Sequence, residues 1–313
     1  MSAFRIGTRG SALALWQART VAARLEQIGH QSEIVIIRTS GDEGSRAAPG
    51  ASGSVKRMFV KEIEDALLRG QVDIAVHSAK DMPSDLPEGL AIAAALPRED
   101  PLDAIVLPIG ADVSGIDSVL AHAGEAPLIG TSSVRRVAQL SALLPRATFA
   151  AIRGNVDTRL RKLDAGPLAA IVLAAAGLRR LGLAARISAT IPIDRCVPAP
   201  GQGIVAIETR ADDDAFAVLH AINDPLAAAA LAAERAVVSA LGGGCQLPLG
   251  AIALHQDGEL HMHGVVVSPD GRRVIRREAR GAAAAPEALG ARLAEELGRG
   301  GGAAILDEVR RLE

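Results

Sequence analysis

Short apolar segments and amphipathic segments alternate along the N-terminal part of the chain. Residues 4–6, 33–38 and 72–76 have the apolar pattern of buried strands, whereas residues 12–28 carry apolar side chains at helical spacing and end at a glycine. A strand, a tight turn and an amphipathic helix in this order are typical of an α/β sheet. The pattern therefore predicts β-turn-α units here.

The same order returns further along the chain. Residues 128–136 repeat the plan of residues 6–11, with a strand, an Ile-Gly-Thr sequence, hydroxyl residues and arginine, and a helix follows each copy. Proline-rich sequence at 97–101 separates the copies, and residues 169–173 predict another buried strand. We interpret these segments as two related α/β halves, each with a helix start suited to an anion.

The C-terminal part has a different pattern. Residues 197–203 are rich in proline and glycine and predict a return crossing, after which a strand at 204–208 rejoins the first half. An alanine-rich helix begins at Asp224-Pro225 and ends at three glycines. Beyond it we expect an antiparallel meander, with strands at 251–254, 259–267 and 272–279 and helices near 286–297 and 303–312.

These segments together predict a mixed α/β protein of three domains. Two doubly wound α/β domains lie around a cleft, and a smaller α+β C-terminal domain carries an antiparallel three-stranded sheet. The expected ranges are 1–100 with 202–221 for domain 1, 101–201 for domain 2, and 222–313 for domain 3.

Composition and charge exclude several classes of protein. A chain of 313 residues with 49% hydrophobic residues is long enough for substantial cores, and its net charge of −2 argues against a nucleic-acid binder that works through a bulk positive field. The longest apolar runs fall short of the roughly 20 residues that span a bilayer. The N-terminus lacks a signal-peptide pattern, so we expect a cytoplasmic protein without membrane contact.

Two cysteines, Cys196 and Cys245, rule out a disulfide scaffold, and no Cys/His cluster with ligand spacing indicates a metal. Cys196 is interpreted as structural. Cys245 stands between three glycines and a proline, so the backbone around it can bend tightly and admit a bulky group. Taken alone, this residue is interpreted as a buried core cysteine, with a redox or nucleophilic role as the alternative.

Polar residues at the ends of the predicted strands suggest an anion site. Ser11 can cap the helix at 12–28 while Arg9 faces the same point, and Lys80 and Asp81 follow the strand at 72–76. Asp81 on position alone could simply cap a turn. Loop 41–57, rich in glycine, serine, alanine and charge, is a candidate lid. The arginines in the predicted loops and helix starts imply a polyanionic ligand between two domains.

One long motif makes the sequence recognisable. Glu234-Arg235, followed by Leu241-x-Gly-Gly-Cys245-Gln-x-Pro-Leu-Gly, resembles the cofactor-attachment signature of the porphobilinogen deaminase (hydroxymethylbilane synthase) family. Similar landmarks occur in the family's order at residues 6–17, 72–83 and 130–136, at Arg153-Gly-Asn-Val and at Pro200-Gly-Gln-Gly. The architecture this implies is a pair of domains of the periplasmic-binding-protein type plus the third domain.

The resemblance implies a transferase of tetrapyrrole and haem biosynthesis. It implies that Cys245 carries a dipyrromethane through a thioether, and that four porphobilinogen molecules are condensed head to tail onto it before hydroxymethylbilane is released. It further implies a monomer, which could pass its product directly to the next enzyme of the pathway. A non-catalytic anionic solute-binding protein and a phosphate-handling transferase remain as alternatives on architecture and anion sites alone.

The same resemblance assigns roles to residues of this chain. The catalytic aspartate falls on Asp81. Cofactor binding falls on Ser78, Lys80, Thr131, Ser132, Ser133, Arg135, Arg136, Gly154 and Cys245, and substrate binding on Arg9, Ser11, Lys56, Phe59, Arg153, Arg159, Arg180 and Gln202.

Overall fold

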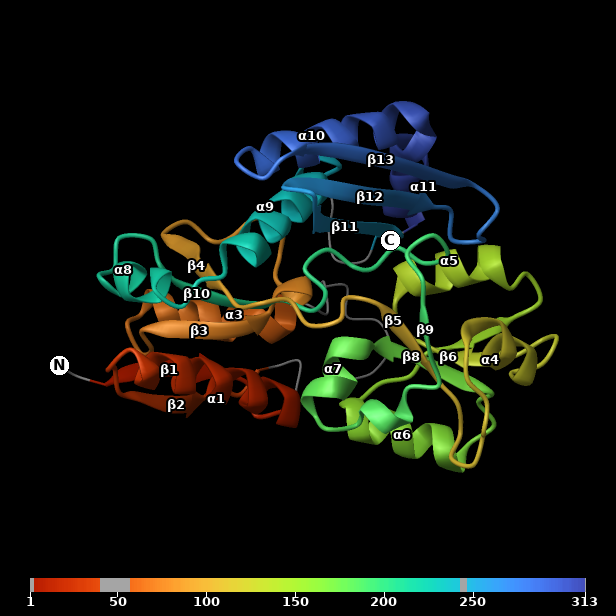
Figure 1. The fold of residues 1–313 in the computed structure, drawn as a ribbon, viewed down its shortest axis with the longest axis horizontal. Helices are drawn as coiled ribbons and strands as arrows, with labels where there is room; N and C mark the ends of the chain where they lie inside the picture. Colours follow the sequence, from red (N-terminus) through yellow and green to blue (C-terminus); the bar gives the residue numbers. More distant parts are fainter. Residues whose placement is uncertain (1–2, 40–56, 243–246, 313) are drawn as a thin grey trace.

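The computed structural model describes residues 3–39, 57–242 and 247–312, which form three sheets with helices packed on them (Figure 1). The expected lid lies outside the described residues, apart from the backbone of its last residue, as do Lys56 and Cys245. For Phe59 only the backbone is among the described parts of the chain.

The first sheet has five strands in the order β2-β1-β3-β10-β4. β1 (Phe4–Thr8) is parallel to β2 (Ser32–Ile36) and β3 (Ile74–Ser78), whereas β10 (Val205–Arg210) is antiparallel to both β3 and β4 (Leu90–Ala95). The apolar stripes of α1 (Ala12–Gln27) and α8 (Ala215–His220) pack in one core cluster, and α3 (Arg57–Leu68) packs in another with the opposite face.

The second sheet also has five strands, in the order β7-β6-β8-β5-β9. β6 (Leu128–Gly130) is parallel to β7 (Thr148–Ala150) and β8 (Ala170–Ala174), and β5 (Asp103–Val106) is antiparallel to β8 and β9 (Ala189–Ile191). α4 (Ile116–His122) and α5 (Val134–Leu143) share one core cluster with the sheet. α6 (Val156–Ala165) and α7 (Ala175–Arg180) share the other, and a short turn, η3 (Ala184–Arg186), follows α7.

The two large sheets share one plan. In each, three parallel strands are followed by an antiparallel strand that comes from a crossing of the chain, β10 in the first sheet and β5 in the second. The segments 96–102 and 192–204 make these two crossings. This common order confirms the predicted α/β fold with two halves of the same type.

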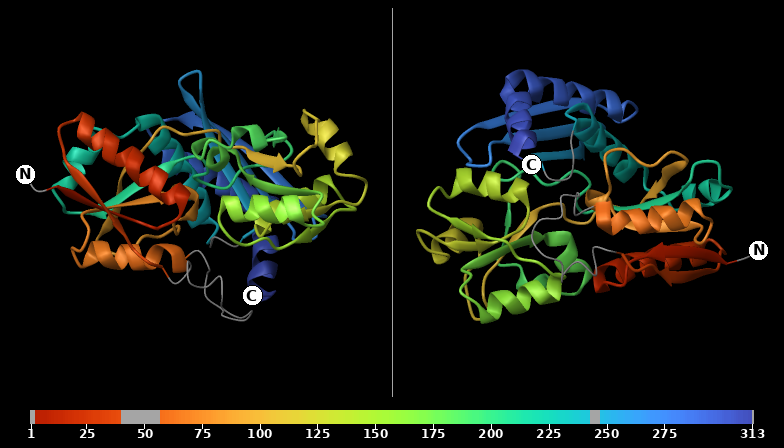
Figure 2. Two further views of the ribbon diagram at one scale, coloured as in Figure 1. Left: turned by 90° about the horizontal axis from the view of Figure 1, so that it is seen from below. Right: turned by 180° about the vertical axis from the view of Figure 1, so that it is seen from behind.

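The third part is the predicted antiparallel meander of β11 (Leu249–Gln256), β12 (Glu259–Val267) and β13 (Val274–Ala282). One face packs against α9 (Pro225–Ala240), α10 (Pro286–Leu297) and, after the turn η4 (Gly298–Gly302), α11 (Ala303–Leu312). The other face rests on the second sheet's α5, where Ile252 and Val265 contact Ala138. Figures 1 and 2 show this part lying over the junction of the two larger ones.

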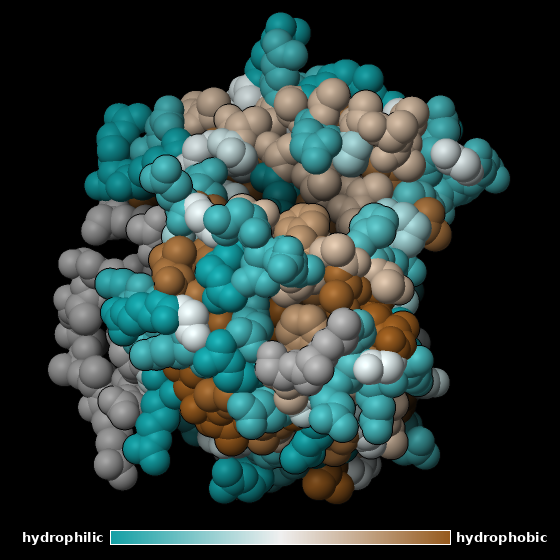
Figure 3. Space-filling view, turned by 90° about the vertical axis from the view of Figure 1, so that its left-hand side faces the viewer, coloured by the Kyte–Doolittle hydropathy of each residue, from teal (hydrophilic) through white to brown (hydrophobic). Residues whose placement is uncertain are grey.

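α9 begins where the sequence predicts. The Asp224 carboxylate accepts a hydrogen bond from the amide of Ala227 at 2.7 Å, and Pro225 occupies the first turn, where its missing N–H costs nothing. At the end of the molecule that Figure 3 shows, apolar and polar residues are interspersed over the surface. Across 3–39, 57–242 and 247–312, no helix combines the length and apolar character needed to cross a membrane.

Candidate active site at the junction of the two sheets

Three helices start with capped N-termini directly after strands of the two large sheets. Ser11 Oγ accepts from the amide of Ala14 at the start of α1, and Ser133 Oγ accepts from the amide of Arg136 at the start of α5. Asn155 Oδ1 caps α6 in the same way, with the amide of Thr158 at 2.9 Å. The capping predicted for Ser11 is therefore present, and each start leaves backbone N–H groups that favour an anion.

Asp81 ends a single turn of 3-10 helix, η2 (Ala79–Asp81), that continues from β3. It is half-buried and borders a small pocket of about 80 Å³. The side chain of Gln17 reaches into this region from α1 and donates to Ser78 Oγ at 2.7 Å. Other residues lining the pocket include Arg9, Ser11 and His77. The structure thus brings four of the expected site residues, Arg9, Ser11, Ser78 and Asp81, to one place.

Gln202 links this turn to the second sheet. Lys80 Nζ lies 3.5 Å from Gln202 Oε1, while Gln202 Nε2 donates to the carbonyl of Pro101 and, at 3.0 Å, to the carboxylate of Asp103. Gln202 is only 1% exposed, so these bonds are made away from water. The residue expected to bind substrate therefore also bridges the two large sheets.

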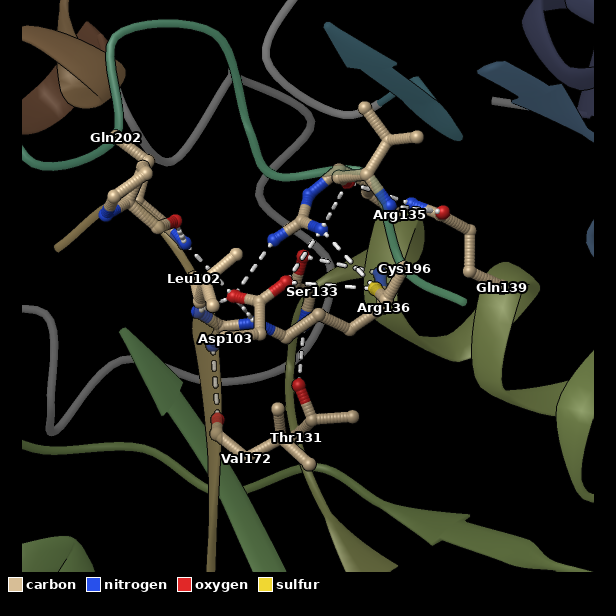
Figure 4. A network of polar contacts seen from close by, with 12 residues as sticks. Leu102, Asp103, Thr131, Ser133, Arg135, Arg136, Gln139, Val172, Cys196 and Gln202 are labelled. Carbon is tan, nitrogen blue, oxygen red and sulfur yellow. Dashed lines mark hydrogen bonds and ion pairs between the residues drawn. The ribbon is translucent and has the colours of Figure 1, made fainter. Parts of the chain in front are cut away.

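A buried network around Asp103 engages two of the predicted cofactor-binding arginines (Figure 4). The Arg135 guanidinium donates to both Asp103 oxygens and to the carbonyl of Val197. Arg136 donates to Asp103 from Nε and one terminal nitrogen, and to the carbonyl of Val172 from the other. Each terminal nitrogen carries a second proton, so these bonds leave Arg136 with further donor capacity. Its predicted role toward a ligand stays a prediction.

The charges in this network stabilise one another. Asp103 is fully buried, and burial alone would raise the pKa of its carboxyl. The positive charges of Arg135 and Arg136 more than offset that effect, so the pKa of Asp103 lies well below its usual range. Burial raises the pKa of the neighbouring Cys196 thiol to about 12, with the charge of Asp103 adding to the effect. Cys196 is thus an inert, structural thiol, as expected.

Within the described ranges, the predicted arginines Arg153, Arg159 and Arg180 have no carboxylate of this kind. Arg159 Nε donates to the carbonyl of Gly154, and one terminal nitrogen of Arg180 donates to the carbonyl of Gly203. The exposed Arg153 side chain makes no hydrogen bond or ion pair within the described ranges.

Arg159 lies in the electrostatic field of both large domains. Burial lowers the pKa of its guanidinium, the positive charge of Arg136 lowers it further, and the negative charge of Asp81 acts in the opposite direction. The charge of Asp81, beside the first sheet, therefore acts on Arg159, which the second sheet carries. A ligand with several carboxylates would relieve the repulsion between the partly buried like charges at this junction.

The remaining predicted residues occupy turns of the second sheet. Ser132 Oγ donates to the carbonyl of Ile152, and Thr131 Oγ1 accepts from the amide of Ser133. Gly154 has φ +115°, and a Cβ there would lie 2.7 Å from the side chain of Thr158, so this turn requires glycine. Within the described ranges no group of three or more His, Cys, Asp or Glu residues is arranged to hold a metal ion.

Several residues at this junction were not predicted from the sequence. Asp103 was not identified because no local pattern marks a carboxylate whose partners lie 32 and 33 residues away. Gln17, Glu234 and Arg235 belong to the motifs that carry the family resemblance, but the sequence alone assigns them no role. The signal that could have identified Glu234 and Arg235 is their position side by side in a long motif.

Two family models match the chain. Residues 4–218 match "Porphobilinogen deaminase, dipyromethane cofactor binding domain", and residues 228–299 match "Porphobilinogen deaminase, C-terminal domain". Similar curated proteins named porphobilinogen deaminase include that of Thiobacillus denitrificans, 44% identical over 98% of this chain and 99% of that protein. The protein of Syntrophomonas wolfei is 45% identical over 99% of this chain and 100% of its own length.

Solved structures with partial likeness include the periplasmic domain of BvgS from B. pertussis. It is 16% identical, with a TM-score of 0.39, over 70% of this chain and 39% of that chain. A likeness of this size carries no functional argument.

Proposed function

The chain belongs to the porphobilinogen deaminase family, and we propose that its active site is the junction between the two large sheets, with Asp81 as the catalytic carboxylate. The cofactor of this family domain is dipyrromethane. The observation that supports the proposal is that Asp81 lines one pocket with Arg9, Ser11 and Ser78, while its negative charge and the positive charge of Arg136 both act on Arg159 of the second sheet. A non-catalytic solute-binding protein is not favoured by similarity to deaminases over nearly the whole chain.

The proposed reaction joins four porphobilinogen molecules in a row. In each step the aminomethyl carbon of one molecule loses its amine as ammonia and forms a carbon–carbon bond to the free α-carbon of the chain, which gives up its proton. Water then releases the linear tetrapyrrole, hydroxymethylbilane. When bound, the dipyrromethane supplies the first α-carbon.

Asp81 is proposed to stabilise the positive charge that develops on the substrate pyrrole as ammonia leaves. A half-buried carboxylate fixed on a single turn after β3 requires little reorganisation when that charge appears. Ser78, held by Gln17, and Arg9 complete the polar wall of the same pocket. We propose that these groups orient the substrate rather than take part in bond making.

The donor set fits a ligand with several carboxylates. Arg153 and Arg159, together with the helix starts at Ser133 and Asn155, offer planar guanidinium groups and backbone N–H donors on one side of the junction. Arg136 adds its remaining donor capacity. We propose that these residues hold the acetates and propionates of the cofactor and growing chain, with Cys245 as the covalent anchor.

The attachment is tested by intact mass and by thiol counting. The purified protein is expected to carry an adduct of two linked pyrrole units, and Cys245→Ser is expected to lack it. Since the chain has two cysteines, only Cys196 should react with a thiol reagent after unfolding, and neither should react in the folded protein. An unmodified wild-type chain with full activity would contradict the proposal.

The catalytic assignment is tested by Asp81→Asn. The variant should fold and keep the adduct, but its turnover should fall by about 10²-fold or more because the amide cannot balance a developing positive charge. Steady-state ammonia release and product formation measure this. Normal turnover by Asp81→Asn would show that another residue carries the catalytic role.

A monomeric state, a cytoplasmic location and transfer of the product to the next enzyme stay predictions. Sedimentation, cell fractionation and coupled assays, respectively, test them.

A further inference from the structure

Helix α9 connects two parts of the proposed active site. It ends at Ala240, shortly before Cys245, and its midpoint carries the adjacent residues Glu234 and Arg235. Arg235 contacts backbone just after Asp81, whereas Glu234 contacts the backbone of the return crossing at Gly201 and also that of β11 at Ala253. The chemistry of the two contacts differs, because one accepts hydrogen bonds and the other donates them.

Arg235 holds the chain just after the catalytic turn. One terminal nitrogen of its guanidinium donates to the carbonyl of Pro83 at 2.8 Å, and the other donates to the carbonyl of Ser84 at 2.7 Å. These carbonyls lie two and three residues beyond Asp81. Met82, between them and Asp81, is 4% exposed and packs in a cluster with Leu231 of the same helix. α9 therefore fixes the exit of the turn by both packing and hydrogen bonding.

Glu234 holds the other side of the same turn. Its fully buried carboxylate accepts from the amide of Gly201 at 2.6 Å and from the guanidinium of Arg98 at 2.7 Å. Gly201 has φ +74°, and a Cβ there would lie 2.9 Å from backbone atoms of both Ala79 and Lys80. The return crossing, residues 192–204, thus packs tightly against the first residues of the catalytic turn. The hydrogen bond from Gly201 to Glu234 anchors this crossing to α9.

We propose that Arg235 is a positioning residue for Asp81, which it orients by fixing the Pro83 and Ser84 carbonyls. The inference rests on the proposed function of Asp81. A planar guanidinium reaches two carbonyls at once with its fixed fork, whereas an ammonium on a flexible stem does not hold both in one geometry. Loss of one contact lets the turn shift, and a displacement of about 1 Å at a reacting group can cost about 10²-fold in rate.

The test compares Arg235→Lys with a matched control. Arg210 also donates to two backbone carbonyls, those of Leu67 at 2.8 Å and Val72 at 3.1 Å, and in addition pairs with Asp213, but none of these partners belongs to the catalytic turn. Arg235→Lys should lower kcat about tenfold, with KM within about twofold of wild type and the cofactor still attached by intact mass. Arg210→Lys should lower the melting temperature and leave kcat unchanged.

A double variant separates positioning from general destabilisation. If Arg235 acts through Asp81, adding Arg235→Lys to Asp81→Asn should lower the residual turnover by less than about twofold, so that the two effects are not additive. Full additivity, a loss confined to KM, or an equal loss of kcat in Arg210→Lys would overturn the inference.

The proposal can also be tested if Arg235→Lys does not fold. Arg235→Gln serves as a second variant, because its amide retains one donor group. Hydrogen exchange of residues 79–84 measures whether the turn has loosened. If both Arg235 variants fail to fold while Arg210→Lys folds, Arg235 is a stability residue and the inference is wrong. A wild-type protein without deaminase activity would instead overturn the proposed function. An active wild type with unaffected Arg235→Lys overturns only the positioning role.

Discussion

Two sets of arginines lie on the second sheet, and their surroundings differ. The internal pair, Arg135 and Arg136, is almost fully buried and shares the carboxylate of Asp103. The outer arginines, Arg153, Arg159 and Arg180, have no carboxylate partner within the described ranges: Arg159 and Arg180 donate to backbone carbonyls, and Arg153 makes no hydrogen bond. A carboxylate raises the pKa of Arg135 against the effect of burial, whereas burial lowers the pKa of Arg159 and Arg180.

The difference indicates how one residue type serves two purposes. A buried guanidinium that already has a carboxylate contributes to the integrity of the fold, and removing its partner leaves charge in a dry interior. A partly desolvated guanidinium without a carboxylate stores unfavourable electrostatic free energy that an anionic ligand releases on binding. The internal pair should therefore respond to substitution mainly in stability, and the outer arginines mainly in ligand affinity.

The largest expected effect is that of Asp103→Asn. This change leaves two buried guanidinium groups without a countercharge and should lower the free energy of unfolding by about 3–5 kcal/mol. Urea denaturation of the purified variant measures the loss. Glu125→Gln, which breaks an exposed ion pair with Arg146, is the control and should have no measurable effect. A stable Asp103→Asn protein would show that the buried carboxylate is dispensable.

Asp103→Asn should also change how the free energy of unfolding depends on pH in acid. Since the pKa of Asp103 in the folded state lies well below its value in the unfolded chain, its contribution to stability is fully present above about pH 4 and is lost as the pH falls further. Wild-type stability should therefore decline in this window more steeply than that of Asp103→Asn. Equal slopes for the two proteins between about pH 2 and 4 would mean that Asp103 is not the group that titrates.

The second effect is that of Arg159→Gln. A charge-assisted contact to a ligand carboxylate is worth about 1.5–3 kcal/mol, so kcat/KM should fall by about 10- to 100-fold. Stability should be unchanged or slightly higher, because the substitution removes the repulsion between Arg159 and Arg136. Initial rates and thermal unfolding of the same preparation give both values. A loss of stability as large as that of Asp103→Asn would erase the distinction between the two arginine sets.

The sequence predicted the elements better than their contacts. The strand–turn–helix units, the second copy near residue 130 and the terminal meander follow from local periodicity and turn residues, and the structure has all three. The division of the arginines into an internal pair and an outer set does not follow from local sequence. It depends on β5 bringing Asp103 beneath α5, an approach that only the folded sheet creates. The contacts of Glu234 and Arg235 likewise arise from docking of the third part.

The smallest expected effect concerns Trp16, the chain's single tryptophan. The Arg180 guanidinium lies over its ring, 5.4 Å from the ring centroid, and Trp16 is 36% exposed, so α1 of the first sheet and α7 of the second meet at this contact. A cation–π contact at an exposed site is worth about 0.5–1 kcal/mol, and Trp16→Leu should therefore raise KM by only about two- to fivefold, whereas Trp16→Phe should restore part of it.

Fluorescence gives a second readout of the same contact, because only one residue emits as tryptophan. Arg180→Gln should change the Trp16 emission, since it removes a cation from the ring face. Arg179→Gln is the matched control, because Arg179 pairs with Asp100 instead of the ring. If the two variants give the same emission, Arg180 does not rest on Trp16 in solution. Arg180 would then be held only by the carbonyl of Gly203, without the support of an aromatic ring, and would differ even more from the internal pair.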